Sequence, residues 1–125
     1  MKFLMVFIGG GAGSVLRYGI SLLTSGIGFR LPVATLLANV MASLCLVVAV
    51  FYIQRQHLSE SFYPFLIVVG FCGGLSTFST FSWETFALIR TGHSAMALVN
   101  VALNLLFALG GLFWLAHYYG MHWRN

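Results

Sequence analysis

Amides and hydroxyls are the side-chain groups of this sequence that could do chemistry, because they recur at regular spacing inside long apolar stretches. Three groups stand out: Thr35, Asn39 and Ser43; the hydroxyl residues between Ser76 and Ser82; and the pair Asn100 and Asn104. Such side chains donate hydrogen bonds and can replace the water around an anion. Acidic residues, which cation and proton-coupled pathways use, are almost absent here, so the lining suits a small, strongly hydrated anion.

Taken singly, each of these polar residues is explained more simply by a hydrogen bond that holds two membrane helices together. Three facing groups in so short a chain exceed what packing requires. Two rings strengthen the interpretation as a pathway, since Phe78 and Phe81 lie three residues apart in the hydroxyl run. The edge of an aromatic ring carries partial positive charge, and an anion can lie against it.

The remaining residues indicate neither an enzyme nor a nucleic-acid-binding protein. Histidines are scattered over loops and ends, at His57, His93, His117 and His122. That scatter argues against a zinc site, and no nucleophile–base pair or phosphate loop is present. Cys45 and Cys72 lie inside apolar stretches, where free thiols are the default. The net charge of +4 comes from basic residues that flank or interrupt these stretches, which favours anchoring at lipid headgroups.

Membrane helices must position these residues. The chain is 60% hydrophobic and 6% charged, with a mean hydropathy of +0.96, which no soluble domain of 125 residues needs. Four long apolar stretches predict an all-α membrane protein with a single domain over residues 1–125. The spans are expected at about 3–23, 33–53, 62–90 and 94–119.

The third span is expected to be broken. As one helix, residues 62–89 would measure roughly 42 Å, too long for a straight crossing of a hydrocarbon core of roughly 30 Å. Gly73-Gly74 and the hydroxyl residues after them weaken a helix at this place. Irregular backbone at membrane depth survives only where protein buries it or water reaches it, so the break points to a site.

The first span carries glycines and one arginine. Gly9 and Gly13 form a G-x-x-x-G pair, which predicts close approach of another helix. Arg17 stands near the far end of the span, where a charge either snorkels to the interface or lies in a polar vestibule; the sequence supports both equally. Lys2 and the apolar run after it also resemble a signal peptide, but the run continues past the glycines as a full span.

The distribution of Lys and Arg between the two sides of the membrane predicts how the spans are oriented. Four spans place both ends of the chain and the loop 54–61 on one side of the membrane. The basic residues there are Lys2, Arg55 and Arg124, against Arg30 and Arg90 on the other side, with Arg17 near its interface. Orientation follows the Lys/Arg bias of short loops, and here the two sides are nearly level. We therefore expect insertion in both orientations and an antiparallel homodimer.

The stretch Gly70–Glu84, GFCGGLSTFSTFSWE, resembles the signature of the CrcB/Fluc family of fluoride channels through its GGLSTFSTFS core. Three other places agree: Gly10–Tyr18 with its Arg-Tyr ending, Thr35-x-x-x-Asn39, and Asn104. The resemblance covers all four spans. It implies passive export of fluoride across the bacterial cytoplasmic (inner) membrane, which lowers cytoplasmic fluoride. It also implies a dual-topology antiparallel homodimer with two pores, embedded in the lipid bilayer.

The resemblance assigns roles to residues along the pathway. Phe78 and Phe81 would face the permeating fluoride ion, and Asn39 would supply an amide donor. The polar track would continue through Ser79, Thr80 and Asn104.

Further roles implied by the resemblance lie beside the pathway. Arg17 would sit in a vestibule that draws anions in. Backbone carbonyls of Gly73 and Ser76 would help hold a structural sodium ion at the dimer twofold. The chain departs from the family pattern at Ala108, where relatives often carry a serine.

A proton-coupled exporter of cationic compounds, similar in size to the small multidrug transporters, is the main alternative. Such exporters rely on an acidic residue in the first span, where this chain has Arg17 and no acid. Glu84 could substitute, but it closes the hydroxyl run near the end of its span. A non-conducting assembly subunit is a third hypothesis, and it would explain the glycines and asparagines but not a helix break.

Overall fold

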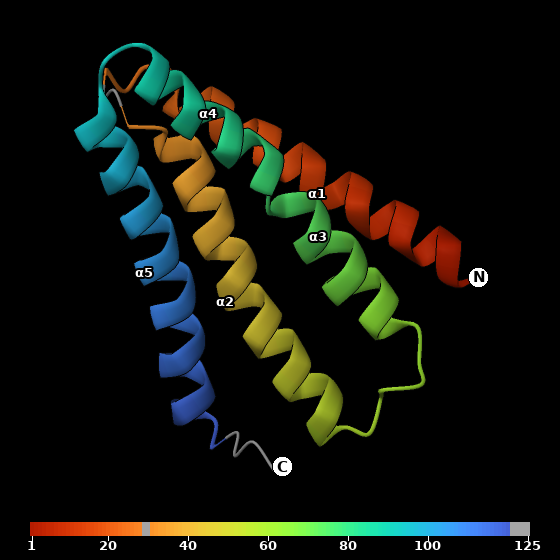
Figure 1. The fold of residues 1–125 in the computed structure, drawn as a ribbon. Helices are drawn as coiled ribbons and strands as arrows, with labels where there is room; N and C mark the ends of the chain where they lie inside the picture. Colours follow the sequence, from red (N-terminus) through yellow and green to blue (C-terminus); the bar gives the residue numbers. More distant parts are fainter. Residues whose placement is uncertain (29–30, 121–125) are drawn as a thin grey trace.

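In the computed structural model, which describes residues 1–28 and 31–120, every regular element is a helix (Figure 1). These elements are α1 Lys2–Thr24, α2 Val33–Arg55, the π-helical segment η1 Pro64–Cys72, α3 Gly73–Leu75, α4 Phe78–Arg90 and α5 Ser94–Tyr118. Within the described residues, four helical spans are long and apolar enough to cross a membrane: Lys2–Thr24, Val33–Arg55, Pro64–Arg90 and Ser94–Tyr118. The prediction of an all-α protein with four membrane-spanning helices is confirmed.

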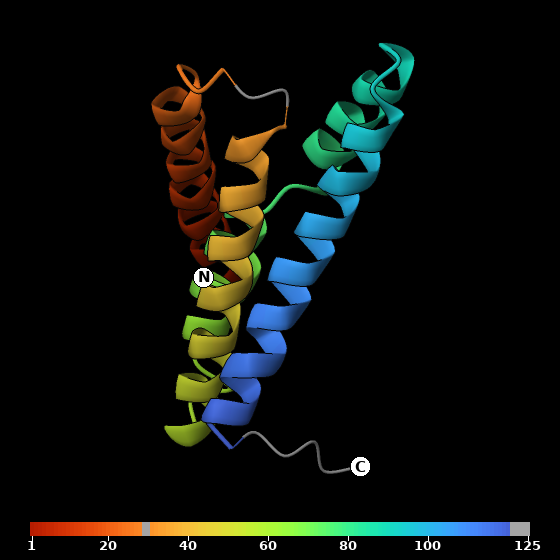
Figure 2. The same ribbon diagram turned by 90° about the vertical axis from the view of Figure 1, so that its left-hand side faces the viewer.

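The third span changes neighbours along its length. Its first part, η1 and α3, packs against α1, whereas α4 packs against α5. Figure 2 shows α2 between these two groups, with α1 on one side of it and α5 on the other. The segment between α3 and α4 therefore crosses the middle of the protomer, where the polar residues of several helices meet.

Small residues let α1 and the third span approach closely. A Cβ at Gly9 would collide with the carbonyl of Leu66, and a Cβ at Gly13 would lie 2.7 Å from the Leu75 nitrogen. A Cβ at Gly74 would lie 2.9 Å from the Cα of Gly10. The close approach predicted from the G-x-x-x-G pair is confirmed, and α1 runs through its glycines without interruption.

The backbone is extended at Ser76 and Thr77, between α3 and α4, and these two residues are called the extended segment. Ser76 has φ −73° and ψ 156°, and Thr77 has φ −152° and ψ 111°. The Thr77 hydroxyl then caps α4 by accepting a hydrogen bond from the Thr80 N–H, 3.2 Å away. Glycines precede this segment, and the Thr77 hydroxyl within it caps the next helix, so the local sequence both ends one helix and starts the next.

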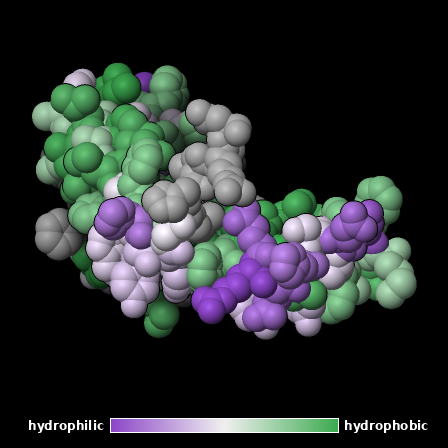
Figure 3. Space-filling view, turned by 90° about the horizontal axis from the view of Figure 1, so that it is seen from below, coloured by the Kyte–Doolittle hydropathy of each residue, from purple (hydrophilic) through white to green (hydrophobic). Residues whose placement is uncertain are grey.

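Basic side chains lie over aromatic rings at the ends of the spans. The Lys2 ammonium is 4.8 Å from the centre of the Phe65 ring, and the Arg90 guanidinium carbon is 5.8 Å from that of Phe86. Figure 3 shows hydrophilic residues gathered at the end of the molecule seen from below, with apolar residues on its flanks. Such ends suit lipid headgroups. Arg30, His122 and Arg124, which entered the sequence predictions, lie outside the described residues.

Candidate functional site

Residues from three spans surround a cavity of about 270 Å³, called here the Asn39 cavity. α2 and the extended segment contribute polar groups, α4 contributes two rings, and α5 contributes an amide and two apolar side chains. The lining residues are Asn39, Ser43, Ser76, Thr77, Phe78, Phe81, Asn104, Leu105 and Ala108. None of them is charged, so the cavity offers a neutral lining of hydrogen-bonding groups and rings.

The extended segment is held by side chains that replace helical hydrogen bonds. In a continuous helix the Thr77 N–H would donate to the Gly73 carbonyl, but here it donates to Asn39 Oδ1, 2.8 Å away. The Gly74 carbonyl accepts instead from Arg17 Nε at 3.3 Å and Ser14 Oγ at 3.4 Å. Side chains from α1 and α2 therefore satisfy backbone groups that the interruption leaves without helical partners.

The rings of the Asn39 cavity differ in burial. Phe78 is 81% exposed at the start of α4, and Phe81 is half-buried one turn later. Their ring centroids are 5.9 Å apart with a 43° angle between the planes. The two rings that line the cavity are therefore tilted against each other and not stacked face to face.

A chain of amide hydrogen bonds leads away from the Asn39 cavity. Asn39 Nδ2 donates to Asn104 Oδ1 at 3.0 Å, and Asn104 Nδ2 donates to Asn100 Oδ1 at 3.1 Å. Asn100 Nδ2 donates in turn to the Thr85 hydroxyl at 3.0 Å. Asn100 and Asn104 are almost fully buried, with 2% and 6% of their surface exposed. These links join α2, α5 and α4 beside the extended segment.

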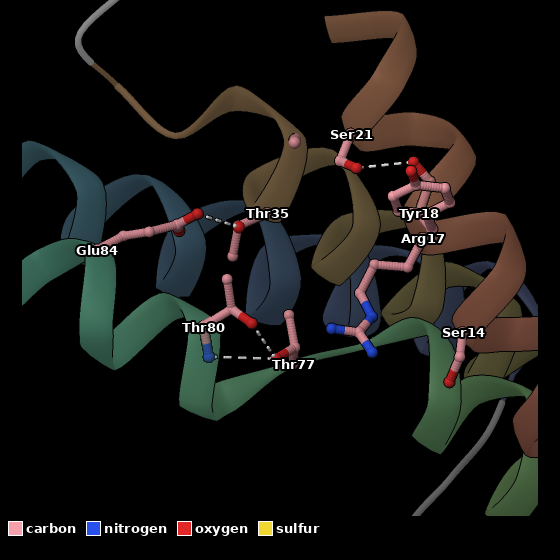
Figure 4. A pocket seen from close by; sticks show the side chains of 9 residues that line it. Ser14, Arg17, Tyr18, Ser21, Thr35, Thr77, Thr80 and Glu84 are labelled. Atoms are coloured by element: carbon pink, nitrogen blue, oxygen red, sulfur yellow. Dashed lines mark hydrogen bonds between the residues drawn. The ribbon is translucent and has the colours of Figure 1, made fainter. Parts of the chain in front are cut away.

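A second cavity of about 270 Å³, the Arg17 cavity, also borders the extended segment, since Thr77 lines it too (Figure 4). Arg17 reaches into it from α1, while Thr35, Thr80 and Glu84 approach from α2 and α4. The complete lining is Ser14, Arg17, Tyr18, Ser21, Ala34, Thr35, Thr77, Thr80 and Glu84. Between snorkelling and a polar surrounding, which the sequence left open for Arg17, the structure gives a polar cavity and a bond to the third span.

Glu84 faces the Arg17 cavity but not the Asn39 cavity. Its Oε1 accepts a hydrogen bond from the Thr35 hydroxyl at 2.8 Å. Its Oε2 is buried and has no hydrogen-bond partner among the described residues. Glu84, the single acidic side chain of the third span, is therefore hydrogen-bonded to α2 through Thr35.

The candidate residues fall into separate groups. Asn39, Phe78, Phe81 and Asn104 meet at the Asn39 cavity, whereas Thr80 lies at the Arg17 cavity. Ser79 is exposed and lines neither of the two, with its Oγ 3.4 Å from that of Thr77. Gly73 and Ser76 line a third cavity of about 210 Å³. The predicted polar track is therefore not a single lining within one protomer.

Sequence reasoning missed residues that act through the backbone. Thr77 received no role of its own, yet it caps α4 and bonds to Asn39. Thr85 was not considered, and it closes the amide chain by donating to the Phe81 carbonyl at 2.8 Å. A threonine three residues after a glycine pair and directly before a helical run is a capping signal that could have identified Thr77. Nothing in the spacing around Thr85 indicates its partner.

Comparisons with known proteins point to one family. Residues 4–117 match the model of the family described as CrcB-like protein, Camphor Resistance (CrcB). A protein of Coxiella burnetii is 39% identical over 113 residues, which cover 89% of this chain and 91% of the relative. Proteins of an Enterobacter species and of Salmonella arizonae are each 42% identical over 115 residues, 90% of this chain and 91% of the relative. All three relatives bear the name fluoride-specific ion channel FluC.

Proposed function

The chain belongs to the CrcB family, and on that premise we propose that it is a multi-pass membrane channel through which fluoride leaves the bacterial cytoplasm passively. The observation that carries the proposal is the Asn39 cavity, because it combines an amide, hydroxyls and two aromatic rings without a charged side chain. The name shared by relatives about 40% identical supports fluoride as the ion. Export along the electrochemical gradient lowers cytoplasmic fluoride without ATP.

The lining fits the chemistry of fluoride. Fluoride is small and strongly hydrated, so a pathway must offer donors that replace its water. Asn39 offers an amide N–H, while Phe78 and Phe81 offer electropositive ring edges. Leu105 and Ala108 complete the wall with apolar groups that cannot stabilise a cation.

The Arg17 cavity is proposed as the vestibule of the pathway. Its guanidinium attracts anions, and the hydroxyls of Thr35 and Thr80 supply donors beside it. Thr77 lines both cavities, so the vestibule and the Asn39 cavity meet at the extended segment. An anion drawn to Arg17 therefore reaches hydroxyl donors next to the rings of α4.

The active unit is proposed to be an antiparallel homodimer in which the third span of each protomer crosses the membrane as a broken helix. Phe78 is a large apolar side chain left 81% exposed beside polar residues, and a partner protomer would cover it. The nearly level Lys/Arg distribution supports insertion in both orientations. Ser79, exposed in one protomer, would then join the track at the dimer interface.

A structural sodium ion is proposed at the twofold of this dimer. The Thr77 N–H donates to Asn39 and not to the Gly73 carbonyl, and Ser76 has extended backbone and is exposed. Carbonyls of Gly73 and Ser76 fit a hard cation with oxygen ligands, which would hold the two breaks together. Replacing sodium by a bulky organic cation during purification is expected to impair assembly, and unchanged dimers and flux would remove the ion from the proposal.

The proton-coupled exporter of cationic compounds is the weaker candidate. The described first span contains no acidic residue, and Glu84 is hydrogen-bonded to Thr35 at the vestibule. A non-conducting subunit does not account for two polar cavities meeting at one extended segment.

A cell-based experiment tests the proposal. The protein is produced in a bacterial strain that lacks its own fluoride export, and cytoplasmic fluoride is measured during fluoride exposure. Cells with the protein are expected to hold less fluoride than cells with the matched Asn39→Leu variant produced at the same level. Equal fluoride in both would contradict the proposed function.

A further inference from the structure

We propose that Thr85, Asn100 and Asn104 are positioning residues that fix which end of the Asn39 amide faces the fluoride pathway. The inference rests on the proposed function, because it assumes that Asn39 donates to the permeating ion. Its basis is the chain of hydrogen bonds Thr77–Asn39–Asn104–Asn100–Thr85. Side-chain amides present a carbonyl and an NH₂ group of nearly the same shape, so something must hold each one in its orientation.

One end of the chain is fixed by a backbone donor. The Thr77 N–H can only donate, so its partner 2.8 Å away on Asn39 must be the carbonyl oxygen Oδ1. Asn39 then turns Nδ2 toward Asn104, whose Oδ1 accepts at 3.0 Å. The extended segment therefore orients the first two amides from one end of the hydrogen-bond chain.

The other end is fixed by a backbone acceptor. The Phe81 carbonyl accepts the single hydroxyl proton of Thr85 at 2.8 Å. The Thr85 oxygen can then only accept, so Asn100 must direct Nδ2 toward it. Asn100 consequently turns Oδ1 toward Asn104 Nδ2, 3.1 Å away. Both ends impose the same direction on every amide between them.

The same bonds distinguish the donor from its supports. Asn104 Nδ2 donates to the carbonyl and the side-chain oxygen of Asn100, at 3.0 and 3.1 Å, so both of its protons are engaged. Asn39 Nδ2 gives one proton to Asn104 and keeps the second for the Asn39 cavity. Asn39 is thus the amide that donates to fluoride, and Asn104 holds it in place.

Thr85 and Asn100 act at a distance, because neither lines the Asn39 cavity. Without the Thr85 hydroxyl, Asn100 Nδ2 loses the side-chain oxygen to which it donates among the described residues, and the Asn100 amide can rotate. Rotation of Asn100 takes its Oδ1 away from Asn104 Nδ2, so Asn104 can rotate and Asn39 is then held by the Thr77 N–H alone. A rotated Asn39 would present its carbonyl oxygen to the pathway, and an oxygen repels an anion.

A matched pair of substitutions tests the inference. Thr85→Val keeps the shape and removes the hydroxyl, whereas Thr85→Ser keeps the hydroxyl. In proteoliposomes, Thr85→Val is expected to lower fluoride flux about tenfold and to reduce the preference for fluoride over chloride, while Thr85→Ser stays within about twofold of the wild type. Dimer content and melting temperature are measured in parallel. Wild-type flux and selectivity in folded Thr85→Val protein would overturn the inference.

A second measurement needs no substitution. Hydrogen exchange of the asparagine side-chain amides in the ¹⁵N-labelled wild type is followed by NMR in lipid nanodiscs. Both Asn104 protons are expected to exchange slowly, and Asn39 to have one slow and one fast proton. Fast exchange at Asn104 would overturn the inference, whether or not Thr85→Val folds. A wild type that does not conduct fluoride would refute the proposed function instead, and the exchange pattern would still test the amide orientation.

Discussion

Arg17 Nε donates a hydrogen bond to the Gly74 carbonyl, 3.3 Å away, and so joins the charge of the first span to the interruption of the third. In a continuous helix the Phe78 N–H would donate a hydrogen bond to the Gly74 carbonyl. The guanidinium is a charged donor, and it makes a stronger hydrogen bond to this carbonyl than the neutral backbone N–H that it replaces. Arg17 therefore supports the extended segment as well as facing the Arg17 cavity.

Removing this bond is expected to affect both stability and flux. Arg17→Leu leaves the Gly74 carbonyl with only the Ser14 hydroxyl, 3.4 Å away, and should destabilise the fold by about 1.5–3 kcal/mol. It should also lower fluoride flux, because the anion-attracting charge is gone. Arg17→Lys keeps the charge and is the matched control. Unfolding in detergent and flux in liposomes measure the two effects, and a fully stable, fully conducting Arg17→Leu protein would contradict both roles.

The contact between α1 and the third span should not tolerate a methyl group. Gly74→Ala places a Cβ 2.9 Å from the Cα of Gly10, and backbone cannot move aside as a flexible side chain can. We expect a loss of about 1–3 kcal/mol in unfolding free energy. Gly11→Ala, at the residue after Gly10 in α1, meets no atom within 4 Å and serves as the control. Equal melting temperatures of the two variants would show that the close approach does not stabilise the fold.

Spacing along the sequence was sufficient for features that depend on one helix at a time. Hydropathy and spacing predicted the four spans and the close contact at Gly9 and Gly13. Partners across helices were harder to predict. The bond from Asn39 to Thr77 depends on how far α2 lies from the extended segment, which no local pattern encodes.

The division of the predicted track has the same cause. Thr80 lies three residues after Thr77 in α4, yet it faces the Arg17 cavity, whereas Phe78 and Phe81 face the Asn39 cavity. The sequence alone placed these residues on one segment but could not say which face each would take. That depends on the angle at which α4 leaves the extended segment.

The rings of α4 provide a test of the pathway itself. Phe78→Ile and Phe81→Ile keep a large apolar side chain but remove the electropositive ring edge. Fluoride flux is expected to fall steeply in each variant, while dimer content by crosslinking stays at the wild-type level. Normal flux in both would reduce the two rings to packing residues.

Fixing the orientation tests the antiparallel dimer. Two or three added lysines on one side of the membrane should lock the chain in one topology, since the natural distribution is nearly level. Each locked variant alone is expected to lose flux, and co-expression of the oppositely locked pair should restore it. The control carries the same number of lysines divided equally between the two sides. Full activity from one locked variant by itself would rule the antiparallel dimer out.

Passive and selective fluoride conduction is most directly measured with purified protein in liposomes. Vesicles loaded with equal fluoride and chloride are diluted into a solution free of both ions, and two ion-selective electrodes follow their release after a potassium ionophore collapses the membrane potential. Rapid fluoride release with chloride retained, without ATP or a proton gradient, is the predicted result. Chloride release at a similar rate, or no fluoride release from folded protein, would contradict the account.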